Sequence, residues 1–146
     1  MSERFETFTV LINRISRNIR KIKNQKMAEY NLRSVHVSCL YYLFLNKELT
    51  ATDLCQRCEE DKATISRAID YLETNGYLIC KSKNLKRYKS PLVLTEKGNM
   101  VGKEISEKTD NVLEEIKDGL SEEERRSFYH SLSIISRELE QVAKNC

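Results

Sequence analysis

The sequence predicts a mainly α-helical protein with one small β-hairpin. Apolar residues recur every three or four positions near both ends of the 146-residue chain, as in long amphipathic helices. Two short helices with capping residues at their starts lie between these ends. Two alternating segments rich in Leu, Ile and Val then flank a basic stretch, as in a hairpin. Short paired helices followed by a hairpin are typical of a winged helix-turn-helix core.

Composition bounds the class of protein. Charged residues make up 32% of the chain and apolar residues 40%, a balance typical of helix-rich globular proteins. No apolar run approaches the roughly 18 residues that a membrane-spanning helix needs. The first residues are polar and charged, unlike an apolar leader segment. We therefore expect a cytoplasmic protein with no membrane partner.

The first predicted element is a long N-terminal helix. Its apolar residues form one narrow seam, and Arg14, Arg17 and Arg20 lie off that seam. A seam of this kind usually packs against another helix. It consists of Phe5, Phe8, Ile12, Ile15, Ile19 and Ile22.

The next helix, from about Ser34 to Asn46, is apolar on most sides and should be buried. The segment Thr50–Asp53 then has the Ser/Thr-x-x-Asp/Glu pattern that caps a helix start. Thr50 or Thr52 could also bind a DNA phosphate there, because a helix start presents unpaired N–H groups. Capping alone explains these residues equally well, so both interpretations stay open.

The helix after Asp61 is the one that we expect in a DNA major groove. Asp61 caps its start, and Gly76 ends it in a left-handed conformation. One face is apolar at helical spacing and should be buried: Ile65, Ala68, Ile69 and Leu72. The opposite face is small and polar with one guanidinium, which suits close approach to base edges. The outward residues are Lys62, Ala63, Ser66, Arg67 and Asp70, with Arg67 the main candidate for reading bases.

Residues 77–80 and 92–95 alternate like two strands of a hairpin. A basic tip beside a groove-binding helix can contact phosphates or enter a minor groove. Pro91 has no N–H, so it should lie at an edge or a bulge. The tip residues expected at DNA are Lys83, Lys86, Arg87, Tyr88 and Lys89.

Charge is distributed unevenly along the chain. From Lys62 to Lys89 there are seven basic and two acidic residues, whereas from Lys103 to Cys146 there are seven basic and eleven acidic residues. Clustered positive charge attracts a phosphate backbone because binding releases condensed counterions. Double-stranded DNA is therefore the expected partner; the alternative is a solvated face without function.

Two long amphipathic helices are predicted at the C-terminal end. Ser121 and Glu124 form a capping box that should start the second of them. A small winged domain cannot bury all these seams together with the N-terminal one. Two copies of the chain could, so we expect a homodimer, with a monomeric helical bundle as the alternative. The seams are Val101, Ile105, Val112, Ile116 and Leu120, then Phe128, Leu132, Ile135, Leu139 and Val142.

Taken in order, these elements resemble the MarR family of winged helix-turn-helix regulators. The local matches are DKATISR at 61–67, LETNG at 72–76 and LTEKG at 94–98, and the resemblance covers essentially the whole chain. It implies homodimers that bind pseudo-palindromic operators, usually to repress transcription, and that often release DNA when a small ligand binds. The family's DNA-contacting positions correspond here to Thr64, Ser66, Arg67 and Arg87.

The resemblance also implies three functional segments. Residues 1–29 would form an N-terminal dimerisation helix, residues 30–98 the winged helix-turn-helix DNA-binding domain, and residues 99–146 the C-terminal dimerisation helices. Dimer contacts are expected at Phe5, Phe8, Ile12, Ile15, Ile19, Phe128, Leu132, Ile135 and Leu139.

Two departures from the family pattern concern the DNA-binding region. The family's wing usually has an Asp-x-Arg pair, but Lys86 and Tyr88 stand at these positions, and Arg87 between them could make the groove contact instead. Before the recognition helix the family often has Gly and an apolar residue, where this chain has Glu59 and Glu60. Two carboxylates close to DNA would oppose binding unless they point away.

The chain has five cysteines, and the Cys55-x-x-Cys58 spacing could indicate a metal site or a redox pair. A structural zinc site needs four ligands, and the two histidines are not close by in sequence, so we expect no metal and no other cofactor. Cys55 and Cys58 are instead expected to be buried structural thiols. Redox-sensing members of the family use a cysteine near the N-terminal helix, and this chain has none before Cys39. A thiol-based redox sensor acting through Cys39 or Cys55 is an alternative.

No enzymatic arrangement competes with these readings. The chain has only four glycines and no Gly-rich phosphate loop, and no Ser-His-Asp or paired-carboxylate pattern is evident. A winged-helix module that binds an acidic protein partner is the other non-enzymatic alternative. A pocket for a small-molecule effector would lie near Ile12, His36 and Cys39, although His36 on an apolar helix is more often a hydrogen-bonded core histidine.

Overall fold

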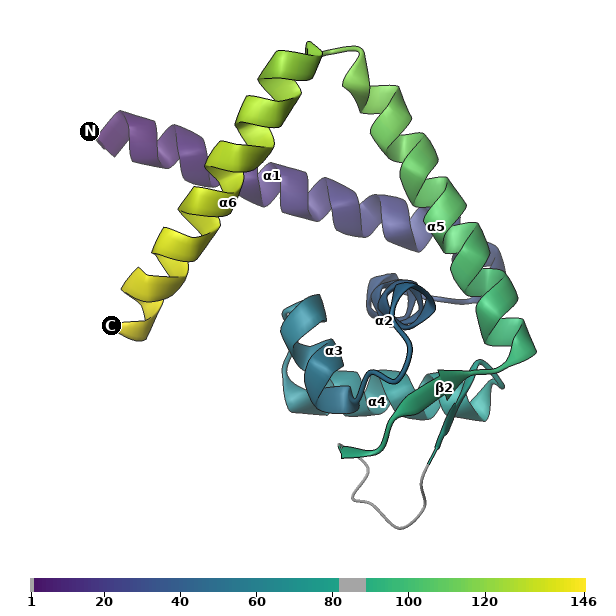
Figure 1. Ribbon diagram of the computed structural model, residues 1–146. Coiled ribbons are helices and arrows are strands. Elements are labelled where there is room, and N and C mark those ends of the chain that lie inside the picture. Colours follow the sequence, from purple (N-terminus) through teal and green to yellow (C-terminus); the bar gives the residue numbers. More distant parts are fainter. Residues whose placement is uncertain (1, 82–88) are drawn as a thin grey trace. The chain divides into compact units, whose positions relative to one another are not determined.

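The computed structural model describes residues 2–81 and 89–146, except the side chains of Ser2, Glu3 and Phe5. Most of the described chain is helical (Figure 1), and the mainly α-helical winged helix-turn-helix class is confirmed. The elements in chain order are α1 (Ser2–Lys26), the 3₁₀ helix η1 (Ala28–Tyr30), α2 (Ser34–Leu45), α3 (Ala51–Cys58), α4 (Lys62–Thr74), β1 (Leu78–Cys80), β2 (Leu92–Leu94), α5 (Glu96–Lys117) and α6 (Glu122–Lys144).

The chain divides into two compact units, residues 1–108 and 109–146. The first contains α1 to β2 and the first part of α5. The second contains the end of α5 and all of α6. This is a division by packing, and the functional segments 1–29, 30–98 and 99–146 stay a prediction.

The hydrophobic core lies in the first unit, where α2, α3 and α4 meet (Figure 1). Leu40, Leu54 and Ile69, one from each helix, have no exposed surface. Burying one such side chain contributes roughly 1.5–3 kcal/mol. The prediction that the second helix is buried on most sides holds along its middle. Leu45 is 51% exposed because it is the last residue of α2, beyond the helices that cover the rest.

The starts of α3 and α4 are capped as the sequence predicts. Thr50 Oγ1 accepts a hydrogen bond of 3.2 Å from the Asp53 N–H, and the Thr50 N–H donates one of 2.9 Å to Asp53 Oδ2. Asp61 Oδ1 accepts a hydrogen bond of 2.7 Å from the Thr64 N–H. These bonds satisfy N–H groups that a helix start leaves unpaired. Both helices of the pair therefore begin at fixed residues.

The end of α4 is also as predicted. Gly76 follows the helix in the left-handed region, with φ of 80°. The Tyr77 N–H then donates a hydrogen bond of 2.8 Å to the Leu72 carbonyl oxygen and closes the turn. The chain later returns to this turn at Gly98, where an added Cβ would clash with the Tyr77 carbonyl oxygen.

The hairpin pairs β1 with β2 in antiparallel register, with Leu78 opposite Leu94 and Cys80 opposite Leu92. Each strand is one residue shorter than predicted. Tyr77 is part of the turn after α4, and Thr95 belongs to the start of α5, where its Oγ1 accepts the Gly98 N–H at 3.1 Å. Pro91 lies just before β2, where no N–H is needed, in agreement with the predicted edge position.

The three long helices form where the apolar seams predict them, but much of their apolar surface is exposed. Ile15 and Ile19 of α1 are each 48% exposed, and α6 has no buried residue among its side chains. Val101 and Ile105 of α5 are buried in the first unit. Leu120 was expected to continue the helix of Val101, but α5 ends at Lys117 and Leu120 lies in the turn before the Ser121 cap.

None of the helices in the described part of the chain combines the length and the apolar character that spanning a membrane requires.

Candidate nucleic-acid interface

The two faces of α4 differ as the periodicity predicts. Ile65, Ile69 and Leu72 have no exposed surface, and Ala68 has only 2%. On the opposite face, Lys62, Ala63, Arg67 and Asp70 are exposed, whereas Thr64 and Ser66 are half-buried. The exposed side of the first turns is therefore small and polar, with one guanidinium. Such a face can approach base edges closely.

Two of the predicted DNA-reading residues contact each other. Arg67 Nη2 donates a hydrogen bond to Thr64 Oγ1, one turn earlier on α4, at 3.4 Å. A bond of that length is weak, so little free energy opposes its exchange for a contact with guanine or phosphate. The contact keeps the Arg67 guanidinium close to the helix surface.

Asp61 fixes the start of this helix. Its hydrogen bond from the Thr64 N–H holds the pKa of the Asp61 carboxyl below its usual range. The resulting carboxylate lies at the positive end of the helix dipole, which favours it. One N–H of the α4 start is thereby committed to Asp61 rather than to an external phosphate.

At the start of α3, the two threonines that were candidates for a phosphate contact differ in their surroundings. The Thr50 hydroxyl also donates a hydrogen bond of 3.0 Å to Asp53 Oδ2, so the capping box engages both the hydroxyl and the N–H of Thr50. This geometry favours capping as the role of Thr50. Thr52 is exposed on the first turn of α3.

The hairpin contributes basic residues at its base. Lys81 Nζ lies 2.6 Å from Glu48 Oε1, a contact that ties the hairpin base to the loop before α3. Both side chains are more than half exposed, so the pair adds little stability. Lys89 is exposed. The predicted tip residues Lys83, Lys86, Arg87 and Tyr88 lie outside the described residues.

An aromatic contact that the sequence analysis missed joins α4 to α2. The Tyr71 ring stacks on the His36 ring, with centroids 4.3 Å apart and planes 17° apart. The Tyr71 hydroxyl donates a hydrogen bond of 2.6 Å to the Asn31 carbonyl oxygen. His36 Nδ1 accepts one of 3.0 Å from the Arg33 N–H, so His36 is a hydrogen-bonded histidine of the fold. Burial lowers its pKa, and Arg33 adds to the effect.

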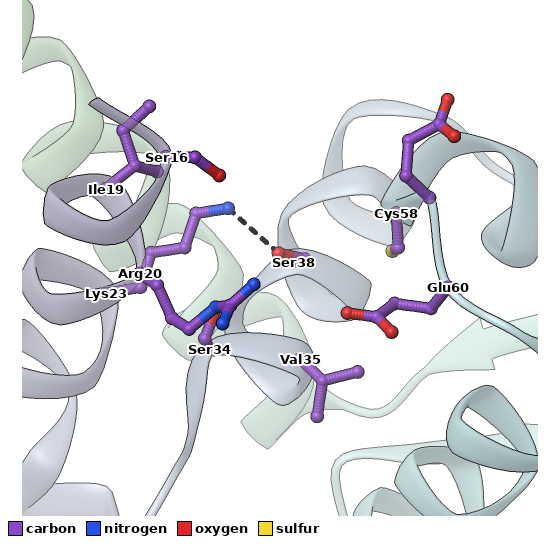
Figure 2. Close-up of a pocket in the computed structure, with 10 residues that line it drawn as sticks. Ser16, Ile19, Arg20, Lys23, Ser34, Val35, Ser38, Cys58 and Glu60 are labelled. Carbon is purple, nitrogen blue, oxygen red and sulfur yellow. Dashed lines mark hydrogen bonds between the residues drawn. The ribbon is translucent and has the colours of Figure 1, made fainter. Parts of the chain in front are cut away.

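A cavity of about 280 Å³ lies between α1, α2 and the end of α3 (Figure 2). Arg20 and Lys23 line it from α1, Ser38 from α2, and Cys58 and Glu60 from the opposite side. Glu59 lines it as well, so both glutamates that precede α4 contribute to the wall of this cavity. The predicted effector residues Ile12, His36 and Cys39 do not line it.

The five cysteines are free thiols, and their burial differs from the prediction. Cys39 is fully buried, but Cys55 and Cys58 are only half-buried, because α3 is short and Cys58 is its last residue, at the cavity. Among the described residues, no group of three or more His, Cys, Asp or Glu side chains is arranged to hold a metal ion.

Comparison with known sequences gives a relative among bacterial regulators. No family model matches the chain. The HTH-type transcriptional regulator YwoH of Bacillus subtilis (strain 168) is 29% identical over 119 residues, which cover 82% of this chain and 86% of YwoH.

Comparison of folds gives MarR family structures along nearly the whole chain. A MarR family transcriptional regulator from Listeria monocytogenes, in complex with 26mer DNA, is 26% identical with a TM-score of 0.79, over 88% of this chain and 85% of that one. MepR in the S. aureus MepR–DNA complex is 19% identical with a TM-score of 0.81, and the match covers 90% of this chain and 97% of MepR. A MarR protein from Peptoclostridium difficile is 24% identical with a TM-score of 0.83, and the match covers 92% of this chain and 88% of that protein. The chain thus has the fold of these regulators.

Proposed function

We propose that this chain, which resembles the MarR family in sequence and fold, is a homodimeric transcriptional regulator that binds a pseudo-palindromic operator and represses transcription. The observation that carries the proposal is the capped α4 helix, with its buried apolar face and its exposed face of small polar residues around Arg67. A likeness to proteins solved with DNA supports it. No enzymatic step is part of the proposal.

In the proposed mechanism each copy inserts residues 62–70 into a major groove. The two half-sites then lie about one helical turn apart on the duplex. Thr64, Ser66 and Arg67 read base edges, while Lys62 and Thr52 contact phosphates. Thr50 acts through the capping box rather than through DNA. From the sequence alone, Lys83, Lys86, Arg87, Tyr88 and Lys89 of the wing are assigned to phosphates and the flanking minor groove.

The homodimer is proposed because apolar surface remains exposed on the long helices. Leu11, Ile15 and Ile19 on α1 are each nearly half exposed. Phe128, Leu139 and Val142 on α6 are between 46% and 59% exposed. A second copy would remove such surface from water at about 25 cal/mol per Å². Residues 1–29 and 99–146 are accordingly assigned to dimerisation and residues 30–98 to DNA binding.

A small-molecule effector fits the same scheme. The cavity beside α2 and α3 borders the helix pair that would hold DNA, so its occupant could bias the position of α4. The lining residues Arg20, Lys23, Ser38 and Glu60 replace Ile12, His36 and Cys39 as the first candidates. Their charges favour a small polar ligand over a purely apolar one.

The test is a selection from random duplex DNA with the purified protein, with its mass in solution measured in parallel. Recovery of a palindromic site by a dimer, with affinity that falls steeply with salt, supports the proposal. Recovery of no common sequence by a folded dimer contradicts it. That result would favour a winged-helix module that binds an acidic protein partner.

A further inference from the structure

The chain leaves α4 and later returns to the same place at the start of α5. Gly76 and Tyr77 form the turn after α4, and Thr95 lies between β2 and α5. The Thr95 N–H donates a hydrogen bond of 3.0 Å to the Tyr77 carbonyl oxygen, and Thr95 Oγ1 donates one of 2.6 Å to the Gly76 carbonyl oxygen. Gly98 approaches this turn so closely that an added Cβ would clash with the Tyr77 carbonyl oxygen. The start of α5 therefore contacts the backbone that ends α4.

Lys97 adds a positive charge to this junction. Lys97 Nζ donates a hydrogen bond of 2.8 Å to the carbonyl oxygen of Asn75, the C-cap residue of α4. The same Nζ lies over the face of the buried Tyr77 ring, 4.3 Å from its centroid. Both contacts favour a cation, because the negative end of a helix dipole and the face of an aromatic ring attract positive charge. We call the hydrogen bonds from Thr95 Oγ1 and Lys97 Nζ to the end of α4 the α4–α5 clamp.

The clamp completes the hydrogen bonding at the end of α4. A helix leaves its last carbonyl groups without partners inside the helix. The Leu72 oxygen accepts the Tyr77 N–H at 2.8 Å, and the Glu73 oxygen accepts the Gly76 N–H at 3.1 Å. These two bonds come from the turn itself. The oxygens of Asn75 and Gly76 are bound from α5 instead, so the turn alone does not fix the end of α4.

The first part of α5 is itself held at several points. Val101 is buried in the core, with 5% of its surface exposed. Glu104 Oε2 accepts a hydrogen bond of 2.6 Å from the Tyr30 hydroxyl of η1. Lys108 Nζ donates one of 2.9 Å to the Lys26 carbonyl oxygen at the end of α1. The clamp therefore attaches the end of α4 to a segment whose own position is fixed.

The clamp also lies at the base of the hairpin. Leu78 and Leu94 face each other in the register of β1 and β2. Leu78 directly follows Tyr77, and Leu94 directly precedes Thr95. The backbone that the clamp holds is thus the backbone from which both strands extend. Loss of the clamp would change the angle between α4 and the hairpin, while the apolar face of α4 would still pack on the core.

We propose that Lys97 is a positioning residue for operator recognition, which holds α4 and the hairpin at a fixed angle without contacting DNA itself. This inference rests on the proposed function, in which α4 enters a major groove and the hairpin reaches the flanking minor groove. Both contacts form together only when the angle between the two elements matches the duplex. Binding to random sequence does not need that match, because it depends on charge. Lys97 therefore contributes to the preference for the operator over other DNA.

The first experiment measures the clamp without DNA. Lys97→Met removes the ammonium, whereas Lys97→Arg keeps a cation that can donate to the same carbonyl oxygen. Amide hydrogen exchange at Gly76 and Tyr77, whose N–H groups bind carbonyl oxygens of α4, reports how firmly the end of the helix is held. Exchange there should be roughly two- to fivefold faster in Lys97→Met, the effect expected when a cation is lost from a helix C-terminus. Lys97→Arg should stay near the parent. The control is Lys103→Met, at an exposed lysine on the same helix, which should leave this exchange unchanged.

The second experiment compares affinities for the selected operator and for random duplex DNA, well below the melting temperature of each variant. Each copy of Lys97→Met has the correct angle less often, and the losses of the two copies multiply, so operator affinity should fall about tenfold. Affinity for random DNA and the salt dependence of binding should match those of Lys103→Met. Lys97→Arg should restore the operator affinity of the parent.

A direct phosphate contact would give a different result. Lys97→Met would then weaken binding to all sequences alike and reduce the salt slope by about one for each lost contact, and this outcome would overturn the positioning role. Equal exchange at Gly76 and Tyr77 in Lys97→Met and the parent would overturn it as well. An operator that Lys97→Met binds as tightly as the parent does refutes this inference alone. A parent protein that selects no operator refutes the proposed function, and the positioning role with it.

Discussion

The ring of Tyr71 on α4 lies stacked on the ring of His36 on α2, with centroids 4.3 Å apart. The Tyr71 hydroxyl also donates a hydrogen bond of 2.6 Å to the carbonyl oxygen of Asn31, the left-handed residue that ends η1. The candidate DNA-reading helix is thus attached to the core by its buried apolar face and by a side contact with α2. Movement of α4 relative to α2 has to disturb this stack.

Removing the Tyr71 hydroxyl should weaken that attachment. Tyr71→Phe keeps the ring stacked on His36 but leaves the Asn31 carbonyl without this donor, so we expect a loss of about 1 kcal/mol in the free energy of unfolding. Urea unfolding followed by circular dichroism measures it. Tyr129→Phe, at a site 47% exposed on α6, serves as the control and should be neutral. Equal stabilities of the two variants would show that the hydrogen bond contributes nothing.

Stability should fall in mildly acidic solution through His36. Burial holds the pKa of folded His36 below its ordinary value of 6.5, so the unfolded chain takes up this proton at higher pH than the folded chain does. The contribution of neutral His36 is therefore fully present above pH 6.5 and is lost as pH falls from that value through the lower folded pKa. His36→Asn should flatten the decline in melting temperature over this window. A decline of the same slope in both proteins would contradict the assignment.

The capping role of Thr50 makes a separate prediction. Thr50→Ala removes the acceptor of the Asp53 N–H and should cost about 1 kcal/mol of stability, whereas Thr50→Ser should retain most of it. Operator affinity of folded Thr50→Ala, measured well below its melting temperature, should stay close to that of the parent. A loss of affinity without a loss of stability would instead support a phosphate contact at Thr50.

The close approach at Gly98 predicts that alanine substitutions at Gly98 and Gly119 have very different effects on stability. An alanine Cβ at Gly98 would clash with the Tyr77 backbone oxygen, whereas at Gly119 the nearest atom is 3.6 Å away. Gly98→Ala should therefore lower the free energy of unfolding by roughly 1–3 kcal/mol or more. Gly119→Ala should stay within about 0.5 kcal/mol of the parent. Thermal unfolding of the two variants compares them directly, and similar melting temperatures would exclude the clash.

Local sequence patterns predicted the elements of this fold well because their causes are local. The Thr50–Asp53 and Ser121–Glu124 boxes, the Asp61 cap and the turn at Gly76 depend on residues within one helical turn of each other. Periodicity likewise assigned the buried face of α4. The errors lay at element ends, as at Leu120, where a following cap stopped the helix earlier than its seam suggested.

Contacts between segments far apart in the chain could not be predicted from such local patterns. The partner of Tyr71 is on another helix, and nothing near Tyr71 in sequence indicates His36. The Cys55-x-x-Cys58 spacing likewise gave no sign that Cys58 would line a cavity together with residues of α1 and α2. The cavity has the same origin, since its walls come from three separate elements. Such sites depend on packing rather than on spacing along the chain.

The most direct test of the proposed function compares two arginine variants on the selected operator. Arg67→Ala removes the guanidinium from the exposed face of α4, and Arg126→Ala removes an exposed arginine from α6, where it pairs with Glu122 at 3.1 Å. If Arg67 binds guanine in the major groove, Arg67→Ala should lose roughly 1–3 kcal/mol of operator affinity and change little on random duplex DNA. Arg126→Ala should bind like the parent. Equal affinity of Arg67→Ala and the parent for the operator would contradict the placement of α4 in the groove.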